Sequence, residues 1–457
     1  MIFSSLLFLF WFIPVFFAVY YIAPKRFRNL VLFLGSIVFY AWGEPKYLVL
    51  LFLSVFVNYA AGRLFAHFDG SRLLQRLCLI LAVIFNFGML FFFKYSNFFI
   101  ENYNRLTGSS LSLINVTLPL GISFYTFQIV SYIADLYCGK IKAEKSLFKL
   151  GTYLCMFPQL LSGPLVSYSR IERELQDRTY SLSGFEEGLR IFILGLGSKV
   201  LIANHAGALW SDITAIGFEK LSMPLAWLGM LAYTLQIYFD FNGYSMMAVG
   251  LGRMLGFDLP KNFNFPYISR SITEFWRRWH ITLSSWFRDY VYIPLGGNRK
   301  GKKRTYVNLL IVWCATGFWH GADWNFILWG LFFFIILSIE KLGLGAFLER
   351  HRIISHIYAL ILIGMSWMIF AISDLSQLFV YFSRLFSFTA GTDVVYYVRN
   401  YAVVLILGCV LSTPALNRLY EKEKRHVFGI LVSVLILLLS VAYLTDAAYH
   451  PFLYFKF

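Results

Sequence analysis

The sequence predicts an all-α polytopic membrane protein, and three observations lead to that prediction. Hydrophobic residues make up 59% of the 457 residues, whereas charged residues make up only 14%. A water-soluble domain has about 25% charged residues, so this chain has too few charged residues to form the surface of a water-soluble protein. The apolar residues gather in stretches close to the roughly 20 residues that cross a bilayer. Finally, the basic residues lie mostly in the short loops between these stretches, which is typical of membrane topology.

The apolar stretches define the expected helices in order along the chain. Several are short or interrupted by glycine and proline, so we expect some of these helices to be tilted or re-entrant. The first stretch has no basic leading segment and no cleavage site, and we expect it to remain as the first helix. The stretches lie near residues 4–22, 30–42, 47–65, 74–94, 116–137, 148–165, 187–204, 223–256, 306–319, 323–340, 354–372, 398–414 and 427–445. We therefore expect one integral-membrane domain over residues 1–457, with about a dozen helices.

The basic loops indicate how this domain is oriented. Counted from the N-terminus, loops at 25–28 and 63–76 fall on one side of the membrane; counted from the C-terminus, loops at 299–304, 341–352 and 418–425 fall on the same side. This side should be cytoplasmic, which places both termini outside the cytoplasm. The net charge of +16 therefore indicates topology, and no nucleic-acid partner is expected.

Residues 257–304 contain no apolar stretch that could cross a bilayer, and we expect them to lie at the membrane interface. Helical periodicity over 274–290 places the rings of Trp276, Trp279 and Trp286 on one face, with Arg277 and Arg288 among the polar residues on the other. His280 falls at the boundary of the two faces. The pattern predicts one amphipathic helix, followed by a turn and a basic cluster at 299–304.

Two histidines stand apart from the six others. His320 ends an apolar stretch beside Trp319 and is followed by a glycine. An imidazole in such a setting suits a general base that takes a proton from a hydroxyl. A helix-end histidine bonded to a carbonyl explains the pattern equally well. For His280, the pattern alone favours an ordinary interfacial residue.

Other polar groups have structural as well as functional interpretations. Asp240 lies inside an apolar stretch and must be paired or protonated when buried, and pairing with an arginine is the simpler interpretation. Asp323 either orients His320 or marks the start of the next helix. The tail 446–457 is rich in aromatic rings and should insert into the protein or the interface. The five cysteines lack the spacing of metal ligands, so no metal site is expected.

Six segments resemble the bacterial membrane-bound O-acyltransferase family, especially its alginate and peptidoglycan O-acetyltransferase branch. The most specific are FWRRWHITLSSWFRDYVYIPLGG at 275–297 and FWHGADW at 318–324. The other four lie at 119–128, 157–164, 239–245 and 262–267. One departure is that Met246 and Met247 follow Gly-Tyr-Ser, where this branch often has an aspartate, so no role of that carboxylate is carried over.

The resemblance implies a fold and a reaction. Its fold is a ring of helices around a tunnel in the bacterial cytoplasmic membrane. Its reaction moves acetyl groups from cytosolic acetyl-CoA, with no permanently bound cofactor, to an SGNH-type partner that acetylates alginate, peptidoglycan or another exopolysaccharide. His320 matches the family's catalytic histidine, His280 its second histidine, and Tyr454 a tyrosine thought to carry the acyl group. Trp319, Asp323 and Asp240 would support this site.

The resemblance leaves the donor site and two other functions open. Coenzyme phosphates could be attracted by the basic cluster, although lipid headgroups would suit it equally well. This cluster comprises Arg299, Lys300, Lys302, Lys303 and Arg304. One alternative function is D-alanyl transfer to teichoic acid. The other, from a different class, is a transporter or flippase, which should tolerate loss of the Tyr454 phenol.

Overall fold

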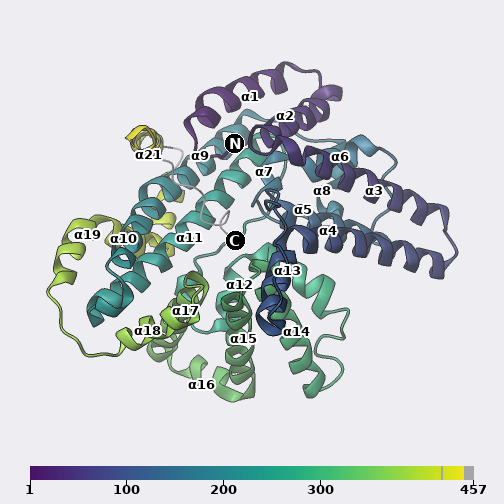
Figure 1. Cartoon of the computed structure of the whole chain (residues 1–457). Coiled ribbons are helices and arrows are strands. Elements are labelled where there is room, and N and C mark those ends of the chain that lie inside the picture. Colours follow the sequence, from purple (N-terminus) through teal and green to yellow (C-terminus); the bar gives the residue numbers. More distant parts are fainter. Residues whose placement is uncertain (424–425, 447–457) are drawn as a thin grey trace. The chain divides into compact units, whose positions relative to one another are not determined.

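The structure, a computed structural model, describes residues 1–423 and 426–446, and all regular elements in these residues are helices (Figure 1). Seven helical segments in the described residues are long and apolar enough to cross a membrane. They are Pro45–His67, Arg72–Thr107, Leu182–Ala215, Trp324–Arg350, Arg352–Ala371, Asp393–Leu411 and Val427–Asp446. The prediction of an all-α polytopic membrane protein is confirmed.

The described chain divides into two compact units, and the boundaries between them fall inside two long helices. The first unit contains residues 1–189 and 248–260; the second contains residues 190–247 and the chain from 261 onwards. Helices α9, Leu182–Gly197, and α11, Met223–Met254, each contribute residues to both units. The candidate histidines both belong to the second unit.

The first unit is built around an aromatic core. The rings of Phe3, Phe8, Phe39 and Phe157 are fully buried, and each touches at least two of the others. Besides parts of α9 and α11, its helices are α1 Ile13–Ile22, α2 Arg28–Gly43, α3 Leu48–His67, α4 Arg72–Thr107, α5 Ile122–Tyr137, α6 Leu147–Cys155, α7 Phe157–Leu160 and α8 Tyr168–Gln176. A π-helical turn, Phe8–Phe12, precedes α1.

The second unit holds the remaining helices. They are α10 Asn204–Ala215, α12 Ile272–Arg278, α13 Ile281–Phe287, α14 Lys302–His320, α15 Trp324–Ile339, α16 Gly345–Arg350, α17 Arg352–Ala371, α18 Leu375–Leu385, α19 Asp393–Leu411, α20 Pro414–Glu423 and α21 Val427–Asp446. A π-helical segment, Ser198–Ala203, joins α9 to α10.

Several expected helices have different bounds because of local chemistry. The stretch 148–165 is split between α6 and α7, with Pro158 in the first turn of α7, where its missing N–H is tolerated. The stretch 74–94 extends instead through α4, whose 36 residues reach about 54 Å at roughly 1.5 Å per residue. This helix is longer than the roughly 30 Å hydrocarbon core of a bilayer.

The prediction of one amphipathic helix over 274–290 is wrong. Helix α12 ends at Arg278, and α13 begins at Ile281. Between them His280 has φ 43° and ψ 54°, in the left-handed region. The break is stabilised by the preceding segment, because the N–H of Asn264 donates to the carbonyl of Arg278 and that of Ile281 to the carbonyl of Asn262. As a result both Trp279 and His280 are buried.

Helices α14 and α15 lie side by side and approach each other at glycines (Figure 1). A Cβ atom at Gly330 would lie 2.4 Å from the carbonyl oxygen of Trp313, and one at Gly317 would lie 2.3 Å from that of Phe326. Gly321, just after α14, packs against the Phe326 ring. Small residues of this kind permit close helix packing in a membrane. Their positions bring the end of α14, with His320, against α15.

A buried ion pair joins the π-helical segment Ser198–Ala203 to α11. The ammonium group of Lys199 contacts the carboxylate of Asp240, and both side chains are at most 5% exposed. The expected pairing of Asp240 is therefore present, but its partner is a lysine and not an arginine. The partner lies far away in sequence, on another helix, where no local pattern could reveal it.

Replacing Gly330 by alanine should destabilise the protein by about 1–3 kcal/mol, because the added methyl group would collide with the backbone of α14. A lowered midpoint of thermal unfolding in detergent would measure this effect. The matched control is Gly88→Ala in α4, where a Cβ would meet nothing within 4 Å. Equal midpoints for the two variants would contradict the close contact of α14 with α15.

Replacing Asp240 by alanine should cost about 3–5 kcal/mol of stability, because the Lys199 charge would stay buried without this carboxylate. The double variant Lys199→Met/Asp240→Leu removes both charges at similar volume and should recover most of the loss. Thermal unfolding of the two variants tests this expectation. A double variant as unstable as Asp240→Ala would show that the charges are not coupled.

Candidate functional site

His320 occupies the last position of α14 in an aromatic environment. Its side chain is 7% exposed. The centre of its ring lies 4.8 Å from that of Trp319, 4.9 Å from Trp329 of α15 and 5.2 Å from Phe370 of α17. Three helices thus enclose the imidazole. The sequence indicated Trp319, but it could not indicate Trp329 or Phe370, because they lie on helices that only the fold brings together.

Asp323 marks the start of α15. Its carboxylate accepts the backbone N–H of Trp324 at 2.7 Å, in the capping position of that helix. Such caps satisfy backbone donors at a helix start that have no partner within the helix. Of the two roles considered for Asp323, the structure supports the helix start.

His280 is buried at the break between α12 and α13. Its side chain is 1% exposed, and its Nδ1 lies 3.1 Å from Oδ1 of Asn262. The ring of Phe241, from α11, meets it edge-on at 4.7 Å between ring centres. Burial disfavours the charged imidazolium and lowers the pKa of His280 to about 3. Burial therefore favours the neutral ring, and protein encloses His280, so the ring is not a surface group on one face of an amphipathic helix.

The fold brings the two histidines to one aromatic residue. Trp319 lies 6.2 Å from His280 and 4.8 Å from His320 between ring centres. Asp240, which pairs with Lys199, directly precedes Phe241 in α11, so the same helix carries the buried ion pair and the ring that packs on His280. The two imidazoles are the groups of this arrangement whose ordinary pKa lets them accept and release a proton near neutral pH.

A cavity of about 260 Å³ in the second unit is lined mainly by residues of α12, α13 and α14. Its walls are mostly apolar and include Trp276, Leu283 and Trp313. Ser284 lies four residues after His280, and Thr316 lies four residues before His320; both line the cavity. The cavity therefore borders the segments that carry the two histidines.

The basic cluster at 299–304 follows a tight turn and is exposed. Asn308 of α14 holds this turn through the carbonyl of Gly297, at 3.0 Å. The five cationic side chains are open to solvent. They could meet either coenzyme phosphates or lipid headgroups, so their role in donor binding stays a prediction.

Tyr454 and the tail 447–457 lie outside the described residues, and the role of Tyr454 stays a prediction. The last described helix, α21, ends at Asp446. Within the described part of the chain, no three His, Cys, Asp or Glu side chains gather as a metal site would require.

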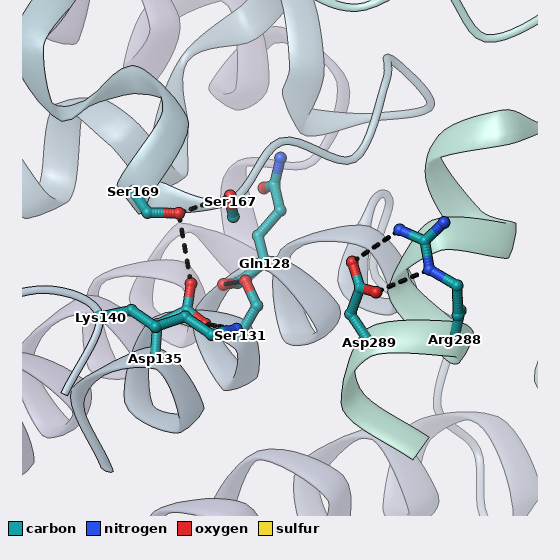
Figure 2. A network of polar contacts seen from close by, with 8 residues as sticks. All are labelled: Gln128, Ser131, Asp135, Lys140, Ser167, Ser169, Arg288 and Asp289. Carbon is teal, nitrogen blue, oxygen red and sulfur yellow. Dashed lines mark hydrogen bonds and ion pairs between the residues drawn. The ribbon is translucent and has the colours of Figure 1, made fainter. Parts of the chain in front are cut away.

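The first unit contains polar groups that sequence reasoning did not single out. Figure 2 shows the carboxylate of Asp135, which accepts from Ser169 at 3.4 Å and pairs with Lys140 at 3.0 Å. Gln128 is 1% exposed, and its side-chain amide has no hydrogen-bond partner among the described residues. Its position inside the motif 119–128 was the available signal.

Figure 2 also shows a separate ion pair in the second unit. The guanidinium of Arg288 contacts the neighbouring carboxylate of Asp289 through two nitrogens, at 2.7 and 3.1 Å. This bidentate contact raises the pKa of Arg288. Both residues belong to the π-helical turn Arg288–Tyr292 that follows α13.

Comparison with known proteins adds independent information. The probable alginate O-acetylase of Pseudomonas aeruginosa is 42% identical over 395 residues, covering 85% of this chain and 75% of that protein. The peptidoglycan O-acetyltransferase of Helicobacter pylori is 36% identical, covering 82% and 78%. A teichoic acid D-alanyltransferase of Streptococcus thermophilus is 35% identical over 244 residues, covering 50% and 57%.

The family profile of membrane-bound O-acyltransferases matches residues 141–383. This range contains both histidines, Asp240 and the basic cluster. Together with the apolar helices described above, the match establishes a multi-pass membrane enzyme that transfers acyl groups. The chain belongs to the membrane-bound O-acyltransferase family.

Proposed function

We propose that this protein moves acetyl groups from cytosolic acetyl-CoA across the bacterial cytoplasmic membrane for O-acetylation of a cell-surface polysaccharide. The main supporting observation is the setting of His320, an imidazole enclosed by Trp319, Trp329 and Phe370 at the end of α14. The names of the relatives from Pseudomonas aeruginosa and Helicobacter pylori support a polysaccharide such as alginate or peptidoglycan as final acceptor.

In the proposed first step, the phenol of Tyr454 attacks the thioester carbonyl. His320 takes the phenolic proton as the new C–O bond forms, and the C–S bond then breaks. The coenzyme leaves as a thiolate and receives the proton from His320, which is ready for another cycle. A phenol has a pKa of about 10 and is a better leaving group than a sugar hydroxyl, so the tyrosyl ester retains transfer potential.

In the proposed second step, an SGNH-type partner outside the cytoplasm takes the acetyl group from Tyr454. Its serine would attack the tyrosyl ester, and a sugar hydroxyl would then attack the serine ester. This order requires the C-terminal tail on the extracytoplasmic side, as the distribution of basic loops predicts. The exposed cluster at 299–304 would meet the coenzyme phosphates on the opposite side.

D-Alanyl transfer to teichoic acid is the second candidate function. The D-alanyltransferase relative of Streptococcus thermophilus favours it, but that likeness covers half of this chain. The likeness to the alginate O-acetylase of Pseudomonas aeruginosa covers 85% at higher identity. Acetyl transfer is therefore the better supported reaction.

Replacing His320 by alanine should lower acetyl transfer by at least about 100-fold, because the attacking hydroxyl loses its base. Release of free coenzyme from acetyl-CoA by purified protein in vesicles measures the rate. His351→Ala is the matched control, because His351 is exposed and stacks on Phe347. A folded His320→Ala variant with nearly unchanged activity would exclude the base.

Replacing Tyr454 by phenylalanine should abolish transfer to the partner, because the acyl-accepting oxygen is lost while the ring remains. Mass spectrometry of the C-terminal peptide should find one added acetyl group in the unmodified protein and none in the variant. Tyr443→Phe, in α21, is the control and should retain the modification on Tyr454. Full acetyl transfer by Tyr454→Phe would rule out the tyrosyl relay while leaving the role of His320 open to its own test.

A further inference from the structure

Hydrogen bonds around Asn262 determine which atom of its side-chain amide faces His280. One atom of the amide lies 3.2 Å from the backbone nitrogen of Thr282 and 3.0 Å from the Thr282 hydroxyl. Because a backbone N–H can only donate, this atom is the amide oxygen, Oδ1. The same oxygen lies 3.1 Å from Nδ1 of His280. Nδ1 must therefore carry a hydrogen and donate it to Asn262.

This arrangement leaves the other ring nitrogen as an acceptor. In a neutral imidazole one nitrogen donates and the other accepts, so the lone pair lies on Nε2. Nε2 of His280 is buried and has no hydrogen-bond partner among the described residues. A buried acceptor without a donor costs about 1–3 kcal/mol. A donor group on a bound substrate would recover this energy.

The backbone at His280 also stores strain. A non-glycine residue in the left-handed region costs about 1–2 kcal/mol, and His280 has φ 43°. This conformation is what separates α12 from α13 and buries the ring. Strain and an open acceptor on one residue are typical of a functional site and unusual for a residue that only fills a core.

We propose that Asn262 is a positioning residue for acyl transfer, which keeps the hydrogen of His280 on Nδ1 and so reserves Nε2 as acceptor for an amide N–H of the coenzyme. The inference rests on the proposed function, since the acceptor is useful only when a substrate reaches the two histidines. An amide N–H of the coenzyme arm offers the required donor, because the single hydrogen of the attacking hydroxyl goes to His320 in the proposed first step.

Charged groups near His280 do not compete for this role. The ring is packed against α11, the segment before α12, the break itself and the end of α14. The ionisable residues in segments 223–247 and 261–280 and at the end of α14, with Lys199 beside them, are Lys199, Tyr233, Tyr238, Asp240, Tyr244, Lys261, Tyr267, Arg270, Glu274, Arg277, Arg278, His280 itself and His320. Asp240 pairs with Lys199, and Glu274 pairs with Arg278 at 2.9 Å. Burial alone accounts for the lowered pKa of His280.

The tautomer can be measured without any activity assay. In protein labelled with ring-¹⁵N histidine and placed in bilayers, solid-state NMR distinguishes protonated from unprotonated ring nitrogens. The His280 signals are those that disappear in His280→Gln. We expect a protonated Nδ1 and an unprotonated Nε2, unchanged between about pH 5 and 8, across which an ordinary histidine titrates. Hydrogen on Nε2 at neutral pH would overturn the proposal.

The variant Asn262→Asp separates positioning from a merely structural role. It keeps an oxygen for Thr282 and for the start of α13, but places a carboxylate beside Nδ1. The carboxylate favours the imidazolium and raises the pKa of His280. Below the raised pKa, Nε2 carries a hydrogen and cannot accept, so kcat/KM should fall roughly tenfold per pH unit. A pH profile equal to that of the unmodified protein would contradict the inference.

The matched control is Thr282→Val, which removes one hydrogen bond from Asn262 without touching the ring and should leave the pH profile unchanged. In His280→Phe, the KM for acetyl-CoA should increase, because the amide N–H of the coenzyme loses its acceptor; an unchanged KM would oppose the proposal. If the unmodified protein transfers no acetyl group, the proposed function fails, whereas the NMR result still tests Asn262.

Discussion

The contact between α14 and α15 is the constraint on which the candidate site depends. Lipid tails are as apolar as leucine, so helices in a bilayer associate through close packing more than through exclusion of water. At Gly317 and Gly330 the two backbones approach where a single Cβ would collide. This approach places Trp329 of α15 against His320. The ring of Trp276, from α12, contacts both Trp329 and Trp313 of α14. The two glycines therefore allow the close approach of α14 and α15 that brings Trp329 to His320.

Aromatic packing also influences the electrostatic properties of His280. A low-dielectric surrounding penalises a charged ring, which is why the pKa of His280 lies far below its usual value. A neutral imidazole can accept a proton or a hydrogen bond, whereas an imidazolium cannot. The same surrounding strengthens every remaining polar contact, including the one between His280 and Asn262. The aromatic packing around His280 therefore also favours the neutral form of its ring.

Several buried polar groups that lack hydrogen-bond partners among the described residues lie in the segments that resemble the family. Gln128 and Gln159 lie in two such segments of the first unit, and each has a buried amide oxygen with no partner among the described residues. His280 and Asn262 are the corresponding groups in the second unit. Each such group costs stability in a membrane protein.

The sequence by itself determined the class of protein and the approximate course of its helices, because hydropathy and periodicity are local properties. It also singled out His320 as a candidate through its flanking motif. Only the tertiary structure decided that α12 and α13 are separate and that Lys199 is the partner of Asp240. It also decided that the side chain of Asn262 contacts the ring of His280 from 18 residues away. A regular helical period cannot reveal a break stabilised by a neighbouring segment. Nor can it reveal which distant side chain compensates a buried charge, since that choice depends on which helices pack together.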